Sequence, residues 1–181
     1  MKQNKCVLAR QFLAQAQHSL KKHYLPRIIR CLEMLSEKQI WWRPNDASNS
    51  LGNLALHLEG NVRQWIISGL GGASDRRVRD KEFAERGPLP RRVLRGKLGK
   101  TVNEACRILA KLSPRELSRP RVIQKFRVSG FEAVSHVTEH FAYHTGQIIY
   151  VTKLLRGRDL GFTHLPGERR KKAAAGKLPA I

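Results

Sequence analysis

Apolar side chains recur at intervals of three and four residues along four long segments of the chain, which is the spacing of a buried helix face. The first segment runs from about Lys5 to Leu35, and the second runs from Asn49 or Ser50 to about Leu70. The third runs from about 90 to 112, and the fourth covers residues 135–155. The sequence therefore predicts an all-α protein built on four long helices.

Proline and glycine residues mark the places where these helices bend or end. Pro26 interrupts the first helix and predicts a kink near Tyr24. Glycines at 69, 71 and 72 end the second helix. A short extended segment is predicted between the third and fourth helices, at Val122, Phe126 and Val128.

The connector between the second and third helices, from Ala73 to Pro90, is long and polar. A chain that returns along a bundle must cover about 25–30 Å, which takes roughly ten residues or more. We therefore expect a crossover here, with the second and third helices parallel. Four of its side chains either line the mouth of a site or belong to a solvated charge run: Arg79, Asp80, Glu82 and Phe83.

Two adjacent tryptophans, Trp41 and Trp42, lie in the connector between the first and second helices. Side chains of this size either close one end of the core or form a wall of a substrate site.

Three histidines occupy the fourth helix at four-residue steps: His136, His140 and His144. Residues four apart lie on one helix face, about 6 Å apart along the axis, so two such imidazoles can bind one metal ion. The outer two would be about 12 Å apart, which is too far for all three to share an ion. One adjacent pair therefore needs a further ligand from another helix, and the spacing leaves open which pair that is.

A fourth histidine, His57, lies beside the apolar stripe of the second helix. A histidine there is either a packed, hydrogen-bonded residue or an inward-pointing ligand of a bundle. Three polar residues share its side of the helix and are candidates for orienting a ligand: Asn53, Asn61 and Gln64. No carboxylate lies at a ligand-like position beside the helix histidines, because Glu139 is rotated by about 100° from His140.

The chain has 181 residues, enough for one domain with a core, and a net charge of +21. A protein this basic binds polyanions non-specifically, whatever its function. The basic residues are spread over most segments, and the sequence lacks the motifs of zinc fingers, RNA-recognition domains and helix-turn-helix proteins.

Three cysteines far apart in the sequence, Cys6, Cys31 and Cys106, argue against a disulfide framework. No apolar run approaches the ~20 residues that span a membrane, and the N-terminus does not resemble a secretory signal. We therefore expect a cytoplasmic protein without a membrane segment.

Three stretches resemble the DinB-like superfamily: NSLGNLALHLEGNVRQWIISGLGG, RDKEFAERG and HVTEHFAYHTGQIIYVTKLLRGRDLGF. The resemblance extends from about Tyr24 to Phe162 and is strongest between Trp41 and Gly72 and in the HTGQI segment. It implies a four-helix bundle with up-down-down-up topology and a long crossover between helices 2 and 3. We assign residues 1–165 to this bundle and residues 166–181 to a basic, flexible tail.

The resemblance also implies a divalent metal site made of His57, His140 and His144, with zinc or nickel as the favoured ion. It leaves His136 as an orienting group, a pocket residue or a surface histidine. Related proteins include thiol transferases that add bacillithiol, mycothiol or glutathione to electrophiles. The resemblance thus implies a metal-dependent thiol transferase or hydrolase that acts on a small electrophile, with a low-molecular-weight thiol as a possible co-substrate.

Two other interpretations remain open at this stage. A basic, non-catalytic protein of the DNA-damage response would bind nucleic acid, in line with the net charge of +21 and with the family's historical name. In a purely structural interpretation, the histidines pack together without a metal. The superfamily often forms homodimers, and nothing in the sequence decides whether this chain does.

Overall fold

The computed structural model describes residues 2–87, 89–163 and 167. Its elements along the chain are α1 (Lys2–His18), η1 (Ser19–Tyr24), α2 (Leu25–Met34), α3 (Glu37–Ile40), α4 (Leu51–Val62), η2 (Arg63–Ser68), α5 (Arg79–Ala84), α6 (Arg91–Leu109), α7 (Pro114–Ser118), β1 (Pro120–Ile123), β2 (Phe126–Ser129) and α8 (Gly130–Arg156). Residue 166 and residues 168–181 of the predicted tail lie outside the described residues.

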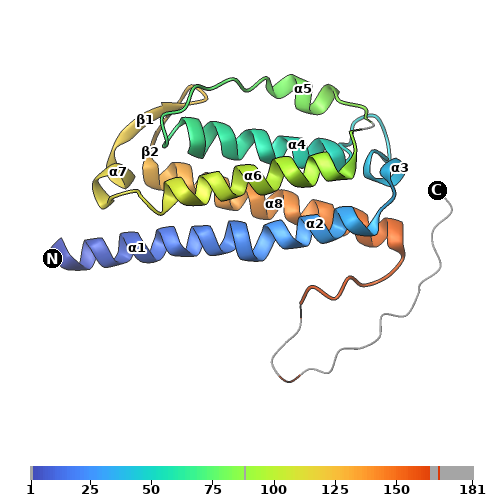
Figure 1. The fold of residues 1–181 in the computed structure, drawn as a ribbon, viewed down its shortest axis with the longest axis horizontal. Helices are drawn as coiled ribbons and strands as arrows, with labels where there is room; N and C mark the ends of the chain where they lie inside the picture. The colour runs from blue at the N-terminus through green and yellow to red at the C-terminus, as the bar shows by residue number, and fades with distance from the viewer. Residues whose placement is uncertain (1, 88, 164–166, 168–181) are drawn as a thin grey trace.

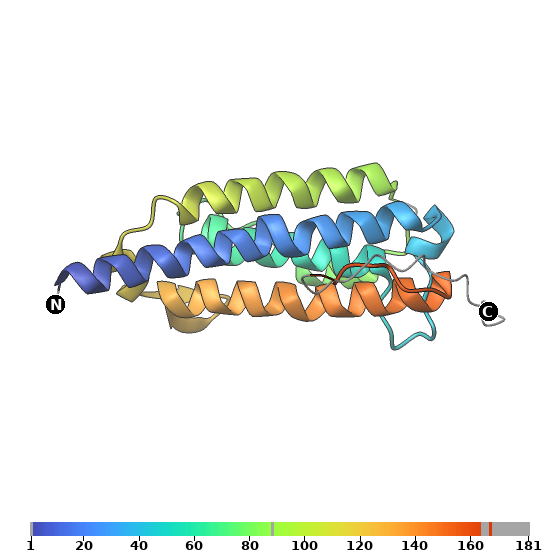
Figure 2. The same cartoon turned by 90° about the horizontal axis from the view of Figure 1, so that it is seen from below.

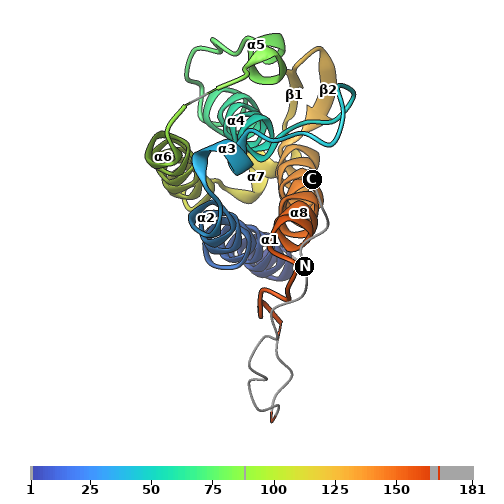
Figure 3. The same ribbon diagram turned by 90° about the vertical axis from the view of Figure 1, so that its right-hand side faces the viewer.

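Four rods form the bundle: α1 to α2, α4 with η2, α6, and α8 (Figure 1). The first and last rods run in one direction, and α4 and α6 run in the other. Seen from the end, the rods form a ring in which α2 and α4 each contact both α6 and α8 (Figure 3). The predicted all-α bundle with up-down-down-up topology is therefore confirmed.

The first rod, made of α1, η1 and α2, continues past Pro26 without a break (Figure 2). The disruption predicted near Tyr24 is a π-helical turn, η1, that ends directly before α2. In this turn the Leu25 N–H bonds to the carbonyl of Leu20, five residues back. Pro26, which has no N–H, then falls in the first turn of α2, where a helix tolerates proline.

The two helices that carry the histidines begin at side-chain caps. Ser50 accepts a hydrogen bond from the Asn53 N–H (3.1 Å) and starts α4. Ser129 accepts one from the Glu132 N–H (3.2 Å), so α8 begins at Gly130, several residues before the predicted start. Gly157, at φ 60°, ends α8 in the left-handed conformation.

Two connectors shape the outer surface of the bundle. The segment between η2 and α6, residues 69–90, is called the return segment. It runs back along the outside of α4 and contains α5 (Figure 1). The predicted extended segment is an antiparallel hairpin of β1 and β2. Its turn residues Gln124 and Lys125 have φ angles of 50° and 71°, as a tight two-residue turn requires.

Trp41 closes the end of the bundle at which α4 and α6 begin. Its ring lies against Gly52 of α4 and Gly87 of the return segment, and its Nε1–H donates to the carbonyl of Leu89 (3.3 Å). These contacts support the interpretation of Trp41 as a plug of the core.

The core between the rods is apolar and continuous, and the following side chains are among the largest fully buried ones: Leu20, Ile28, Leu32, Leu58, Ile66, Leu94, Leu98 and Phe141. Among the described residues, no helix combines the length and the apolar character needed to cross a membrane.

Two glycine-to-alanine substitutions test this packing in opposite directions. A Cβ at Gly99, inside α6, would have no atom within 4 Å, so Gly99→Ala should raise the free energy of unfolding by roughly 1 kcal/mol. A Cβ at Gly52 would lie 2.7 Å from the Trp41 ring, so Gly52→Ala should lower it by about 1–3 kcal/mol. Urea denaturation measures both. Equal stabilisation by the two variants would contradict the placement of Trp41.

Candidate metal centre

Three histidine side chains from two rods meet at one point of the bundle interior. His57 of α4 is buried, and His140 and His144 of α8 are half-buried. The Nε2 atom of His140 lies 3.1 Å from that of His57 and 3.2 Å from that of His144. One ligand nitrogen from each ring lies within 4.8 Å of the other two. The structure thus brings together the three residues that the resemblance selected.

Hydrogen bonds on the far side of two rings fix where their protons sit. The His57 Nδ1–H donates to Glu82 Oε2 (2.9 Å), and the His144 Nδ1–H donates to Gln147 Oε1 (2.6 Å). Arg77 Nη2 lies 3.2 Å from His57 Nδ1, but its shorter contact is with Glu82 Oε2 (2.8 Å). Because both acceptors are oxygens without protons, each imidazole in its neutral form keeps its proton on Nδ1 and directs an Nε2 lone pair at the cluster.

His140 lies between these two lone pairs and is poorly satisfied by protein groups. A single proton on its Nε2 can serve only one of its two neighbours, and its buried Nδ1 has no hydrogen-bond partner among the described residues. Burial, reinforced by the neighbouring histidines and Arg77, lowers the pKa of His140 to about 3, so the ring is neutral near pH 7. Neutral imidazoles with converging lone pairs are the donor set that a divalent cation requires, so the residues fit a metal ion.

A buried ion pair supports the His57 side of the cluster. Arg77 binds Glu82 through two bonds, from Nε to Oε1 (2.7 Å) and from Nη2 to Oε2 (2.8 Å). The Arg77 side chain is only 3% exposed. Burial alone would raise the pKa of Glu82, but the hydrogen bonds from Arg77 and His57 outweigh it and hold this pKa below its ordinary value. Glu82 is therefore an ionised acceptor for His57.

Two residues of α4, Asn53 and Gly60, allow the return segment to approach closely enough for Glu82 to reach His57. Asn53 Nδ2 donates to the carbonyls of Glu82 (2.9 Å) and Glu85 (2.8 Å), which fastens α5 onto α4. Gly60 leaves room for the ion pair, because a Cβ there would collide with Glu82 Oε1 and lie 2.9 Å from Arg77 Nε. Both positions are occupied by residues that the close approach of the return segment requires.

Sequence analysis named Glu82 as a residue that either lines the mouth of a site or belongs to a solvated charge run, but it did not place this carboxylate beside His57. Glu82 is 25 residues from His57, and only the crossover brings it there. The available signal was Gly60, a glycine inside the second helical rod one turn after His57, together with a long charged connector. Arg77 was missed for the same reason.

The other polar candidates have distinct places. Gln64 accepts from Arg77 Nη1 (2.9 Å) and donates to Asp75 (2.8 Å), so it holds the ion pair from the far side. Asn61 Nδ2 lies 3.2 Å from His136 Nε2, and the His136 ring packs on Trp65 at a centroid distance of 4.0 Å. The His136 ring therefore packs beside the cluster, 5.5 Å from the His140 ring centroid, and is not part of the three-histidine group.

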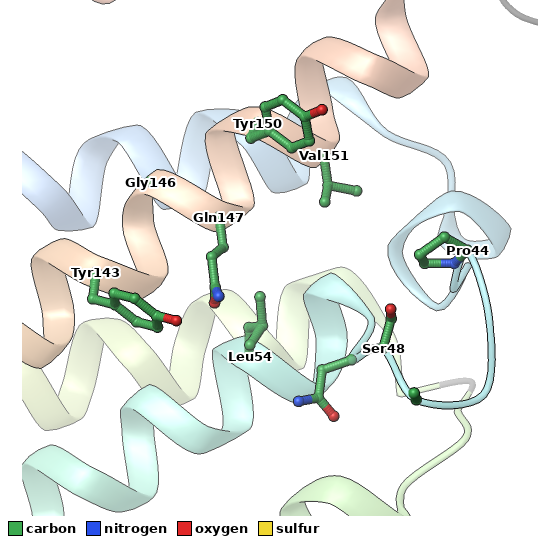
Figure 4. A pocket seen from close by; sticks show the side chains of 10 residues that line it. Pro44, Ser48, Leu54, Tyr143, Gly146, Gln147, Tyr150 and Val151 are labelled. Carbon is green, nitrogen blue, oxygen red and sulfur yellow. The ribbon is translucent and has the colours of Figure 1, made fainter.

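An uncharged pocket of about 620 Å³ lies next to His144, between α8 and the chain that leads into α4 (Figure 4). Gln147, which binds the His144 ring, points from α8 towards Leu54 of α4. Ten residues line the pocket, and none is charged: Pro44, Ala47, Ser48, Asn49, Leu54, Tyr143, Gly146, Gln147, Tyr150 and Val151. The pocket therefore suits a neutral, partly apolar molecule.

Comparison with known proteins places this geometry in a family. The sequence family described as "Protein of unknown function (DUF1572)" matches residues 7–169. The chain belongs to this family. No curated protein sequence matches this chain.

A solved structure shares the fold of the DUF1572 protein. It is the crystal structure of a DinB-like protein from Bacillus cereus, with 14% sequence identity and a TM-score of 0.56. The match covers 73% of this chain and 85% of that chain. The fold is therefore DinB-like, as the sequence motifs predicted.

The role of Glu82 can be tested by removing its charge while keeping its shape. Glu82→Gln leaves a weaker acceptor for the His57 Nδ1–H and should lower zinc affinity by roughly 10- to 100-fold. Glu85→Gln on the same segment is the matched control, because among the described residues the Glu85 carboxylate accepts only from the backbone N–H groups of residues 86 and 87. Zinc titration against a chelating dye compares the variants. Equal zinc affinity in the two variants would show that Glu82 does not support the site.

Proposed function

We propose that this protein is a metal-dependent enzyme, a thiol transferase or hydrolase, that acts on a small electrophile. The observation that carries the proposal is the convergence of three Nε2 lone pairs from His57, His140 and His144. Two of these rings are held in place through Nδ1 by Glu82 and Gln147. The DinB-like fold of the chain is consistent with this proposal.

The donor set supports a cation with open coordination positions. Three neutral imidazoles leave room for a water or a substrate atom, and zinc and nickel both suit imidazole ligands. A divalent cation in such a site lowers the pKa of a bound water or thiol and yields a nucleophile at neutral pH.

The surroundings of the cluster favour a thiol over a water as the nucleophile. Both oxygens of Glu82 are engaged, Oε1 with Arg77 and Oε2 with Arg77 and His57, so this carboxylate is not free to accept a proton from water. A thiol needs less assistance, because its pKa of about 8.5 is already close to neutral. In the proposed transfer, the thiolate sulfur forms a bond to the electrophilic carbon while the bond to the leaving group breaks, and the leaving group takes the electron pair.

The uncharged pocket beside His144 is the proposed place for the electrophile. Its volume of about 620 Å³ lies within the range of small-molecule sites. Tyr143 and Tyr150 offer aromatic surface, and Gln147 connects the pocket to the His144 ring. A neutral substrate fits this lining better than an ionic one, because an ion would be desolvated without a partner.

Metal content provides the first test. Protein expressed without a histidine tag should contain about one divalent ion per chain, and His140→Ala and His144→Ala should each lose most of it. His136→Ala is the matched control from the same helix and should keep its metal. Elemental analysis of the four purified proteins measures this. Full metal content in His144→Ala would overturn the proposed site.

Activity provides the second test. The metal-loaded chain should transfer a low-molecular-weight thiol to a neutral electrophile such as a haloarene or epoxide, and His140→Ala should reduce the rate by at least roughly 100-fold. Mass spectrometry of the thioether product measures the transfer. A metal-loaded protein that neither transfers thiols nor hydrolyses esters or amides across a panel would contradict the enzymatic proposal while leaving the metal site intact.

A further inference from the structure

A second cavity of about 680 Å³ lies between α4, the return segment and α6. Leu56 and Gly60 of α4 and Arg63 of η2 mark one wall of this cavity, about a quarter turn around the rod from His57. Arg77 and Glu82 also line it, so the ion pair that supports His57 separates this cavity from the histidine cluster.

The charges that line this cavity do not balance. Two of its cations are paired, Arg63 with Glu59 and Arg77 with Glu82. Four further cations line it: Arg76 and Lys81 from the return segment, and Lys97 and Lys100 from α6. None of these four forms an ion pair with any residue that the structure describes. The remaining carboxylate, Glu85, accepts from two backbone N–H groups.

The Glu59 carboxylate in the cavity lining is bonded to neighbouring side chains, which reduces its repulsion of an anion. Glu59 Oε1 accepts from Arg63 Nε (3.0 Å) and from the Thr101 hydroxyl (2.7 Å), and Arg63 Nη2 donates to the same hydroxyl (3.0 Å). This network neutralises the carboxylate within the wall and leaves the four unpaired cations to set the potential.

The excess of cations is a local feature as well as a consequence of the overall charge of +21. The pocket beside His144 has a similar volume and no charged lining residue, whereas this cavity has six cations and three carboxylates. The four unpaired cations stand on two separate parts of the chain, the return segment and α6, and α4 packs against both α5 and α6. Like charges held around one cavity repel each other, and a bound anion would relieve that repulsion.

We propose that this cavity binds a small molecule that carries a phosphate or diphosphate group. Lysine and arginine are the side chains that bind phosphate oxygens, and the six cations of the lining outnumber its three carboxylates, which favours a multiply charged anion such as a diphosphate. A volume of about 680 Å³ is that of a small-molecule site. The proposal depends on this cavity alone, and it does not require that the histidine cluster binds metal.

Binding of inorganic pyrophosphate and of ADP, measured by isothermal titration calorimetry at about 0.15 M salt, tests the proposal, with adenosine as the uncharged comparison. The titration is run on the natural chain and on His140→Ala. The variant distinguishes phosphate bound in the basic cavity from phosphate bound to a metal at the histidine cluster. Saturable binding of about one ligand per chain in both backgrounds is expected, because a cavity of this size holds one small molecule. Binding that disappears in His140→Ala would assign the phosphate to the metal centre and overturn the proposal.

Paired charge removal shows where the ligand sits. Lys97→Gln combined with Lys100→Gln should weaken pyrophosphate binding by at least roughly tenfold. Lys21→Gln combined with Lys22→Gln removes an equal number of positive charges from η1 and should leave pyrophosphate binding nearly unchanged. Equal weakening in both double variants would mean that net charge alone attracts the anion. Absence of saturable binding to either phosphate compound, or binding of duplex DNA alone, would likewise overturn the proposal.

Discussion

The structure of the site depends on one constraint, the direction of the Nε2 lone pairs of three neutral imidazoles. Two acceptors on the outer side of the cluster, Glu82 and Gln147, keep the protons of His57 and His144 on Nδ1. Protein groups alone cannot satisfy the lone pairs that then converge on His140. A metal ion can, which is why the cluster is better explained as a cation site than as a hydrogen-bonded group of the core.

The topology of the bundle supplies the support for this arrangement. Because α4 and α6 are parallel, the chain must return along the whole bundle between them, and the return segment lies on the outside of α4 (Figure 1). That segment carries both members of the Arg77–Glu82 pair to His57. A buried ion pair is a costly element with little net stabilisation. We explain this ion pair by its effect on His57. Arg77 holds Glu82 in place through two hydrogen bonds, and Glu82 is then an ionised acceptor for the His57 ring.

Local signals in the sequence predicted much of the fold. Helical periodicity located the four rods, and the start of α4 was predicted at Asn49 or Ser50, of which Ser50 is the cap. The start of α8 was predicted too late, since the cap at Ser129 precedes the histidine-rich stretch. The π-helical form of η1 could not be derived from Pro26 alone, because a proline within a helix is compatible with a kink, a break or a change of hydrogen-bond register.

The site was only partly predictable for a physical reason. The four-residue spacing on α8 was the same for His136–His140 and His140–His144, so only the position of His57 on a neighbouring rod decides between the pairs. Glu82 and Arg77 reach His57 from 25 and 20 residues away, and no periodicity reports such contacts. The basic cavity was not predicted for the same reason, because only the crossover brings Lys81 and Lys97 to the lining of one cavity.

Nitrogen-15 NMR of the imidazole rings tests the central claim most directly, since it reports the proton position and the metal contact of each histidine. The chain contains seven histidines, which single substitutions assign. The account predicts that His57 and His144 carry their protons on Nδ1 in the metal-free protein, and that one equivalent of zinc shifts the Nε2 resonances of His57, His140 and His144 together. Protons on Nε2 of His57 and His144, or zinc-induced shifts on a different set of histidines, would contradict it.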